Sequence, residues 1–191
     1  MVPELDEITT GRLRLWSAGP DDAFRLLRYH QDNWEHLRRW SPPVPDDYLT
    51  LGYWERRLAA ERGAAEGGRA ARWAISWHDD EVARVIGTIG LTDIVRGPVE
   101  SATVGYGLAA REQGKGVMTE ALAAVARHAF QPLALHQLFA GYLPVNEPSG
   151  RVLRRVGFQV VGYLRDHIFI NGAWRDHVLA QLVEPTARPP A

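Results

Sequence analysis

The segment Arg111-Glu-Gln-Gly-Lys-Gly116 contains the residue types of a loop that holds a phosphate. Two glycines flank Lys115, and the segment lies between a strand-like run, SATVGYGLAA, and a helix-like run, VMTEALAAVARHAF. A loop in this position can turn its backbone N–H groups inward, where the unpaired N–H groups of the first helical turn join them. Glycine is required wherever a side chain would block the phosphates. Diphosphate binding and a plain glycine-rich turn that caps a helix are equally good interpretations of this hexapeptide alone.

Two common phosphate-binding motifs do not fit the segment. A Walker A loop requires Gly, four residues and then Gly-Lys-Ser/Thr. Here six residues separate Gly107 from Gly114, and Gly116 stands where the magnesium-binding hydroxyl should be, which excludes a nucleotide triphosphatase of this type. A dinucleotide-binding fingerprint can be forced onto Gly105-x-Gly107-x-x-Ala110, but that motif opens a helix directly after the first strand of a βαβ unit. In this chain another loop intervenes and the strand comes late, so the fingerprint is disfavoured.

A third pattern, Arg/Gln-x-x-Gly-x-Gly/Ala between a strand and a helix, fits Arg111, Gly114 and Gly116 without adjustment. Downstream stands a second motif, NEPSGRVLRRVGF, which starts at Asn146 and contains Ser149. Taken alone, Asn146 is typical of a helix N-cap or a turn, and Ser149 of an early helical position. The two motifs in this order are far more specific than the glycine loop by itself.

With these motifs the chain resembles the GNAT acetyltransferases, and within them the branch of ribosomal-protein N-terminal alanine acetyltransferases. The opening TTGRLRLWSAGPDDA, the run VIGTIGL and the run VGYGL before the loop resemble the corresponding segments of that branch. The resemblance spans nearly the whole chain. It implies that the protein uses acetyl-CoA as co-substrate, needs no metal and acetylates a primary amine.

The resemblance implies that acetyl-CoA binds mainly through backbone groups. Leu108 and Ala110 alternate along a strand and would direct backbone groups toward the pantetheine arm, which Asn146 would also hydrogen-bond. The N–H groups from Gln113 onward would take the diphosphate. Lys115 adds charge or is simply a solvated surface residue, and the same choice holds for the arginine that opens the loop. The predicted cofactor-binding residues are Leu108, Ala110, Arg111, Gln113, Gly114, Lys115, Gly116, Val117, Met118 and Asn146.

Acetyl transfer needs a polarised thioester carbonyl, a neutral amine and a stabilised leaving thiolate. A backbone N–H near Leu108 or Ala109 is the candidate for polarising the carbonyl. The resemblance implies that Ser149 lies near the sulfur, as a proton donor or a thiolate-stabilising donor. The predicted catalytic residues are Ser149, Asn146 and Glu100, of which Glu100 is the candidate for a weak base.

The general base is where this chain departs from the family. Many members carry Glu two residues before the Gly-Tyr pair, and here that position is Thr103. The nearest acid is Glu100 in the preceding turn, and Asp166 and His167 on a late strand are alternatives. The chain has no cysteine, which excludes a thiolate nucleophile and a Cys-ligated metal.

A missing base favours an acceptor that is already neutral near pH 7. An N-terminal α-amine meets this condition and a lysine side chain does not, so we expect a protein N-terminus as acceptor. A small-molecule amine, such as an antibiotic or a metabolite, and a non-catalytic acyl-CoA-binding module stay open as alternatives. The resemblance implies that the early helices line the acceptor cleft, with Trp34, Glu35 and Trp40 as candidate contacts.

The elements that must position these residues follow from periodicity and turn signals. Strands are expected at 12–16, 72–77, 84–94, 101–109, 136–143, 158–166 and 173–183, the last two joined at Asn171-Gly172. Helices are expected at 20–30, 33–40, 46–62, 116–130 and 147–156, with a break at 63–68 and with Phe24 and Leu27 on a buried face. The fold class is α+β, GNAT-like: a mixed, mostly antiparallel sheet flanked by helices, with a central β-α-β crossover that binds acetyl-CoA.

Composition sets the limits of this reading. The 191 residues indicate one acetyltransferase domain, 1–184, followed by a polar, proline-rich tail, 185–191, that we expect to be flexible. The counts of 22 Lys+Arg and 23 Asp+Glu give no global attraction to nucleic acid or to an anionic membrane. No apolar run is long enough to span a membrane, and the N-terminus does not resemble a signal peptide. We therefore expect a cytoplasmic protein without nucleic-acid or membrane partners, as a monomer or a homodimer.

Overall fold

A single mixed sheet organises the chain. The computed structural model describes residues 7–184, and the predicted flexible tail, 185–191, lies outside them. Eight strands pair in the order β1-β2-β3-β4-β5-β6-β8-β7, and all neighbours are antiparallel except β5 and β6. The strands are β1 (Ile8–Thr9), β2 (Leu13–Trp16), β3 (Ala71–Trp77), β4 (Gly87–Val95), β5 (Ser101–Leu108), β6 (Gln137–Tyr142), β7 (Gln159–Ile170) and β8 (Ala173–Val183).

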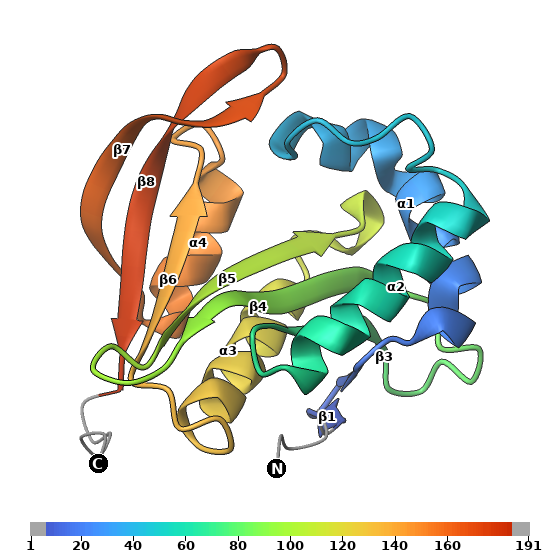
Figure 1. Cartoon of the computed structure of the whole chain (residues 1–191), viewed down its shortest axis with the longest axis horizontal. Helices are drawn as coiled ribbons and strands as arrows, with labels where there is room; N and C mark the ends of the chain where they lie inside the picture. The colour runs from blue at the N-terminus through green and yellow to red at the C-terminus, as the bar shows by residue number, and fades with distance from the viewer. Residues whose placement is uncertain (1–6, 185–191) are drawn as a thin grey trace.

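Helices cover both faces of the sheet. They are α1 (Ala23–Leu37), α2 (Leu51–Glu66), α3 (Val117–Phe130) and α4 (Glu147–Val156), with short 3₁₀ helices η1 (Pro20–Asp22), η2 (Arg38–Trp40) and η3 (Ala110–Glu112). Figure 1 shows α2 on one face of the sheet and α3 with α4 on the other. The connection β5-α3-β6 is the only parallel crossover in the described part of the chain. The α+β prediction, with its central β-α-β unit, is confirmed.

Each face of the sheet has its own hydrophobic core. Along β3, Trp73 and Ile75 pack with residues of α3 and α4, whereas Ala74 packs with residues of α1 and α2. This alternation follows from the two-residue period of a strand, which sends neighbouring side chains to opposite faces. The two cores therefore lie on opposite faces of the sheet.

The first two helices differ from the sequence expectation. Residues 20–40 form one continuous helical segment, in which α1 is preceded by η1 and followed by η2. Phe24 is 62% exposed, because the buried stripe of α1 is formed by Ala23, Leu26 and Leu27. The second helix starts late because the hydroxyl of Thr50 caps it by accepting a hydrogen bond from the N–H of Tyr53. It also continues to Glu66, through the first four residues of the break predicted at 63–68, since a single glycine inside a helix costs only about 1 kcal/mol.

Two strand boundaries also shift. The strand expected at 84–94 begins at Gly87, because residues 78–86 form the connection that follows β3. The first strand of the last hairpin continues to Ile170, and a register irregularity between Leu164 and Ile168 accommodates the extra residues. The predicted helix 147–156 and the Asn171-Gly172 turn are confirmed.

The parallel pairing of β5 with β6 is short. It covers Ser101↔Gln137 to Thr103↔Phe139 and then stops, although β5 continues to Leu108. Beyond this point β6 pairs with β8 alone, so the two strands diverge (Figure 1). The second half of β5 therefore exposes one backbone edge in the middle of the sheet.

His30 sits in an aromatic cluster between α1 and α2. Its ring stacks on Trp54 with centroids 4.3 Å apart, and its Nδ1 lies 2.9 Å from the hydroxyl of Tyr48. Burial, aided by the positive charges of Arg57 and Arg72, lowers the pKa of His30 to about 3. The imidazole therefore stays neutral in the folded protein at every pH near neutrality.

The neutral state of His30 predicts an acid-sensitive fold. In the unfolded chain a histidine has a pKa near 6.5. Below that pH the unfolded state binds a proton, whereas His30 in the folded state stays neutral. The free energy of unfolding therefore falls as the pH is lowered from about 6.5 toward the pKa of the folded state. Between pH 7 and pH 5 this group should cost about 2 kcal/mol of unfolding free energy. Urea unfolding at both pH values should show that loss in the wild type and a clearly smaller one in His30→Phe. An exposed control, His78→Phe, should keep the full loss; an unchanged pH dependence in His30→Phe would contradict the assignment.

Candidate active site

A large cleft opens where β5 and β6 separate. Its volume is about 820 Å³, and it is lined by α1, the segment 40–48, β4, β5, the loop that leads into α3, and the start of α4. Volumes of this size are typical of sites that hold cofactors and drug-sized ligands. The tip of the β7–β8 hairpin reaches the opposite wall, where Asn171 Nδ2 donates a hydrogen bond to the carbonyl oxygen of Arg39 in η2 at 3.2 Å (Figure 1).

Small residues form the floor of the cleft. On β4 and β5 the alternate residues face α1 and α2, in three cross-strand pairs: Thr88↔Gly107, Gly90↔Gly105 and Thr92↔Thr103. A Cβ atom at Gly105 would meet nothing within 4 Å, whereas one at Gly107 would lie 3.3 Å from the hydroxyl of Tyr29. The floor is thus open at Gly105, whereas at Gly90 an added Cβ atom would lie 3.3 Å from Cγ of Arg72. The floor residues carry hydroxyl groups but no charge.

The glycine loop supplies a row of unpaired N–H groups. Gly114 and Gly116 have φ values of +75° and +77°, in the left-handed region that glycine tolerates best. Gly116 is the N-cap of α3 and offers no side chain to the helix end. Within the described residues, the N–H groups of residues 114–119 donate to no other backbone group. Free N–H donors at the positive end of a helix dipole are the features that favour the binding of an anion.

The charges of the loop are already partly neutralised. Glu112 is 7% exposed, and its carboxylate pairs with Lys115 Nζ at 2.9 Å and with Arg111 Nε at 3.4 Å. Arg12 Nη1 donates to the carbonyl oxygen of Lys115 at 3.1 Å and so ties the loop to the first strands. Lys115 is therefore ion-paired within the loop, with its side chain 51% exposed.

Backbone directions along β5 select one donor for the cleft. The N–H of Ala109 donates to Ile86 O at 2.8 Å, toward β4. Because successive N–H groups of a strand point to opposite edges, the N–H of Leu108 points toward the divergence from β6. Ala109 is therefore removed as a candidate donor and Leu108 stays. The N–H of Ala110 donates to Asn33 Oδ1 at 3.2 Å, which is a contact with α1 that the sequence did not predict.

The start of α4 brings Asn146 and Ser149 into the same cleft. Asn146 is the N-cap of α4, where its Oδ1 accepts a hydrogen bond from the N–H of Ser149 at 3.3 Å. Ser149 Oγ lies 2.9 Å from the hydroxyl of Tyr106, a residue of β5 that also lines the cleft. Burial raises the pKa of Tyr106 to about 12, so this hydroxyl is protonated and can hydrogen-bond Ser149.

Sequence reasoning missed Tyr106, although a signal was present. The residue belongs to the run VGYGL and alternates with Gly105 and Gly107, so it must project from the opposite face of β5. That face is covered by α3 and α4, and α4 carries Ser149. The pairing itself required the three-dimensional position of α4, which no local pattern supplies.

The acidic candidates lie elsewhere. Glu100 occupies the turn before β5, where its carboxylate accepts hydrogen bonds from Arg96 at 2.9 Å and from the N–H of Gly97 at 2.8 Å. The eight residues of β5 separate it from the loop, which corresponds to about 25 Å. Neither Glu100 nor Asp166 nor His167 lines the cleft, and the structure does not bring them to Ser149. Among the described residues, Glu112 is the only carboxylate in the cleft wall.

The aromatic candidates divide in the same way. Trp40 lines the cleft, whereas Trp34 packs on Tyr48 with ring centroids 5.1 Å apart. Glu35 is exposed and pairs with Arg38 at 2.9 Å.

In the part of the chain that the structure describes, no group of three or more His, Cys, Asp or Glu side chains is placed to hold a metal ion. No helix of residues 7–184 combines the length and the apolar character needed to cross a membrane.

Comparisons with known proteins agree with this geometry. Residues 12–159 match the family model described as acetyltransferase (GNAT) domain. The chain is 34% identical over 188 residues to the [ribosomal protein uS5]-alanine N-acetyltransferase of Escherichia coli (strain K12), which covers 98% of this chain and 95% of that protein.

Two solved structures of acetyltransferases are similar to this chain over nearly its whole length. The ribosomal-protein-S5-alanine acetyltransferase from Vibrio fischeri superposes with a TM-score of 0.91 at 29% identity, covering 96% of this chain and 100% of that one. Mycobacterium smegmatis RimJ in complex with CoA-disulfide gives a TM-score of 0.87 at 28% identity, covering 96% of this chain and 91% of that one. The family model and the full-length relatives together show that the chain belongs to the GNAT acetyltransferase family.

Proposed function

We propose that the protein transfers an acetyl group from acetyl-CoA to the N-terminal α-amine of a protein, of the ribosomal-protein type. The observation that carries this proposal is the divergence of β5 from β6 directly beside a loop with unpaired N–H groups. Relatives support the choice of substrates: RimJ of Mycobacterium smegmatis was solved with a CoA-disulfide, and the Escherichia coli relative acts on an alanine of ribosomal protein uS5.

The two substrates approach from opposite faces of the sheet. The diphosphate of acetyl-CoA binds the N–H groups of residues 114–119, at the start of α3. The pantetheine arm follows the free edge of β5 between α3 and α4, where the N–H of Leu108 donates to the thioester carbonyl. The acceptor enters over the floor beneath α1 and α2, and the two meet at the divergence.

A glycine variant tests the cofactor loop. Gly116→Val places a β-branched residue at a φ of +77° and puts its side chain among the N–H donors, so CoA affinity should fall at least about tenfold. Gly68→Val is the matched control, because Gly68 also has a positive φ, +65°, but lies in the turn after α2. Calorimetry with CoA should show normal affinity for the control; equal affinity of both variants would place the diphosphate elsewhere.

The reaction is a direct attack of the neutral amine on the thioester carbonyl. As negative charge builds on the carbonyl oxygen, the N–H of Leu108 stabilises it. When the C–S bond breaks, Ser149 donates a hydrogen bond or its hydroxyl proton to the departing sulfur, and the proton that the new amide nitrogen loses returns to Ser149 through water. Tyr106 holds Ser149 in place through the 2.9 Å contact. Asn146 fixes the first turn of α4, and with it the position of Ser149.

The role of Ser149 predicts a selective kinetic defect. Ser149→Ala should lower kcat about tenfold to a hundredfold, because the donor acts mainly as the thiolate leaves. The affinity for CoA, measured by calorimetry on the same preparation, should change less than about twofold. An unchanged single-turnover rate would leave Ser149 with only its structural place in the first turn of α4.

The lack of charged residues on the floor favours an amine that is already neutral near pH 7. Only a neutral amine attacks, and at pH 7.5 about a third of N-terminal α-amines are neutral, against roughly 0.1% of lysine side chains. Thr103 lies on the floor, and no carboxylate lies there among the described residues. An α-amine can lose its proton to solvent before it binds, so this site needs no strong base for it.

Two peptides of identical sequence test the acceptor class. One carries a free N-terminus and a blocked lysine, and the other carries a blocked N-terminus and a free lysine. At pH 7.5 the first should be acetylated at least about a hundredfold faster, because of the difference in neutral amine. Faster acetylation of the lysine peptide would overturn the α-amine proposal, and CoA binding without turnover of any amine would favour a non-catalytic module.

A further inference from the structure

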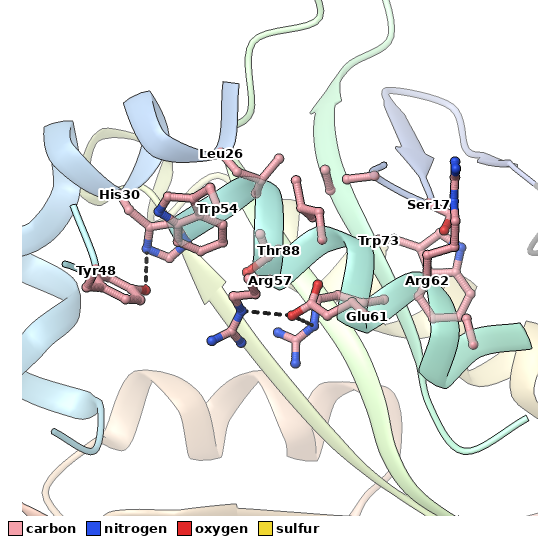
Figure 2. Close-up of a pocket in the computed structure, with 15 residues that line it drawn as sticks. Ser17, Leu26, His30, Tyr48, Trp54, Arg57, Glu61, Arg62, Trp73 and Thr88 are labelled. Atoms are coloured by element: carbon pink, nitrogen blue, oxygen red, sulfur yellow. Dashed lines mark hydrogen bonds and ion pairs between the residues drawn. The ribbon is translucent and has the colours of Figure 1, made fainter. Parts of the chain in front are cut away.

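Two arginines stand at the acceptor end of the cleft with one shared carboxylate. Glu61 of α2 pairs with Arg57 of the same helix at 2.9 Å and with Arg72 of β3 at 3.1 Å. Both arginines line the main cleft and also a chamber of about 120 Å³ that adjoins it. Figure 2 shows Arg57 and Glu61 projecting side by side from α2, close to Thr88 of the cleft floor.

The pair carries one unbalanced positive charge. His30, which also lines the chamber, is neutral, and Arg62 lies at the far end of the chamber from the cleft floor (Figure 2). Among the described residues that line the chamber, Glu61 is the only acid. Two positive charges and one negative charge at its opening into the cleft therefore leave a net charge of +1.

Hydrogen-bond donors remain available in this group. Arg57 is held by Glu61, by the hydroxyl of Tyr53 at 2.8 Å and by the ring of Trp54, 5.6 Å away. Within the described residues, Arg57 Nη2 and both Nη atoms of Arg72 make no hydrogen bond. The indole N–H of Trp54, which is 4% exposed and lines the chamber, also has no partner there. The side chains of Arg57 and Arg72 are 34% and 38% exposed, so their free donors can meet a carboxylate that enters from the cleft.

The sheet register connects this group to the reaction point. Arg72 pairs with Gly90, and Gly90 pairs with Gly105 on β5, so the three residues form one row across the sheet. Two strand spacings place Arg72 about 10 Å from the edge of β5 where the thioester lies. In this row the Arg72 side chain lies against Gly90, where an added Cβ atom would be 3.3 Å from Arg72 Cγ, and the floor is open at Gly105. An extended peptide covers that distance with about three residues.

We propose that Arg57 and Arg72 form a subsite for the carboxylate of an aspartate or glutamate within residues 2–4 of the acceptor protein. The α-amine lies at the divergence of β5 and β6, the peptide follows the glycine row, and its acidic side chain reaches the two guanidinium groups. Guanidinium groups match a carboxylate with paired N–H donors, which gives both affinity and geometric specificity. The proposal rests on the proposed function and names the sequence feature that the acceptor carries.

Matched peptides test the subsite. Each has an N-terminal alanine and a single aspartate at position 2, 3 or 4, and each is compared with its asparagine counterpart, which keeps the shape and removes the charge. For at least one position, kcat/KM of the wild type should be about tenfold higher for the aspartate peptide. Arg72→Gln and Arg57→Gln should reduce this ratio to within about twofold while the rate with the asparagine peptide stays nearly constant.

Arg56→Gln is the matched control. Arg56 lies on the same helix and pairs with Asp47, but it lines neither the cleft nor the chamber. This variant should keep the wild-type preference for aspartate. Thermal unfolding of all three variants measures how far each substitution destabilises the fold. If Arg72 and Arg57 serve only to join α2 to β3, their variants should lower the rates with both peptides equally. That outcome would overturn the subsite.

Binding of acetylated products separates this inference from the proposed function. Calorimetry measures the affinity of N-acetylated aspartate and asparagine peptides for the complex of the enzyme with CoA. A preference for aspartate that disappears in Arg72→Gln supports the subsite even if no peptide is turned over, in which case the proposed function alone fails. Equal binding and equal turnover of both peptides at all three positions would overturn the subsite and leave the proposed function standing.

Discussion

The interruption of one strand pair is the constraint on which the rest of this structure depends. β5 and β6 share only three residue pairs, from Ser101↔Gln137 to Thr103↔Phe139. A backbone edge without a partner is costly inside a protein unless water or a ligand satisfies its polar groups. Here the edge lies between two helical layers, and a ligand that offers amide groups of its own can complete the pairing. The missing pairs therefore create the binding surface.

Different groups of the site lie on the two faces of the sheet beside this gap. On the side of α3 and α4 lie the loop with unpaired N–H groups and the contact between Tyr106 of β5 and Ser149 of α4, which are groups that a cofactor would need. On the side of α1 and α2, β4 and β5 form an uncharged floor that ends at Arg57 of α2 and Arg72 of β3. Because neighbouring residues of β5 face opposite layers, the single run VGYGL contributes to both halves of the site.

Much of the fold was predictable from sequence, because the signals are local. The loop at Gly114 and Gly116 and the helix that begins after Asn146 follow from glycine placement and capping. The phase of α1 was not predictable, since Phe24 and Leu26 are both apolar and only the packing against α2 decides which is buried.

The site was predictable only where it depends on one loop or one helix end. The contact of Tyr106 with Ser149 joins residues 43 positions apart, and Glu61 meets Arg72 only through the way α2 lies on β3. Glu100 shows the converse: it is close to the site in sequence, yet the length of β5 carries it to the other end of the sheet. Nearness along the chain is a poor guide wherever an extended strand intervenes.

The contact between Asn171 and Arg39 has a consequence for access to the cleft. The hydrogen bond links the tip of the β7–β8 hairpin to η2, two segments that are 132 residues apart in the chain. A single exposed hydrogen bond contributes only about 1 kcal/mol. The hairpin can therefore part from η2 at little cost in free energy when a ligand has to pass between them.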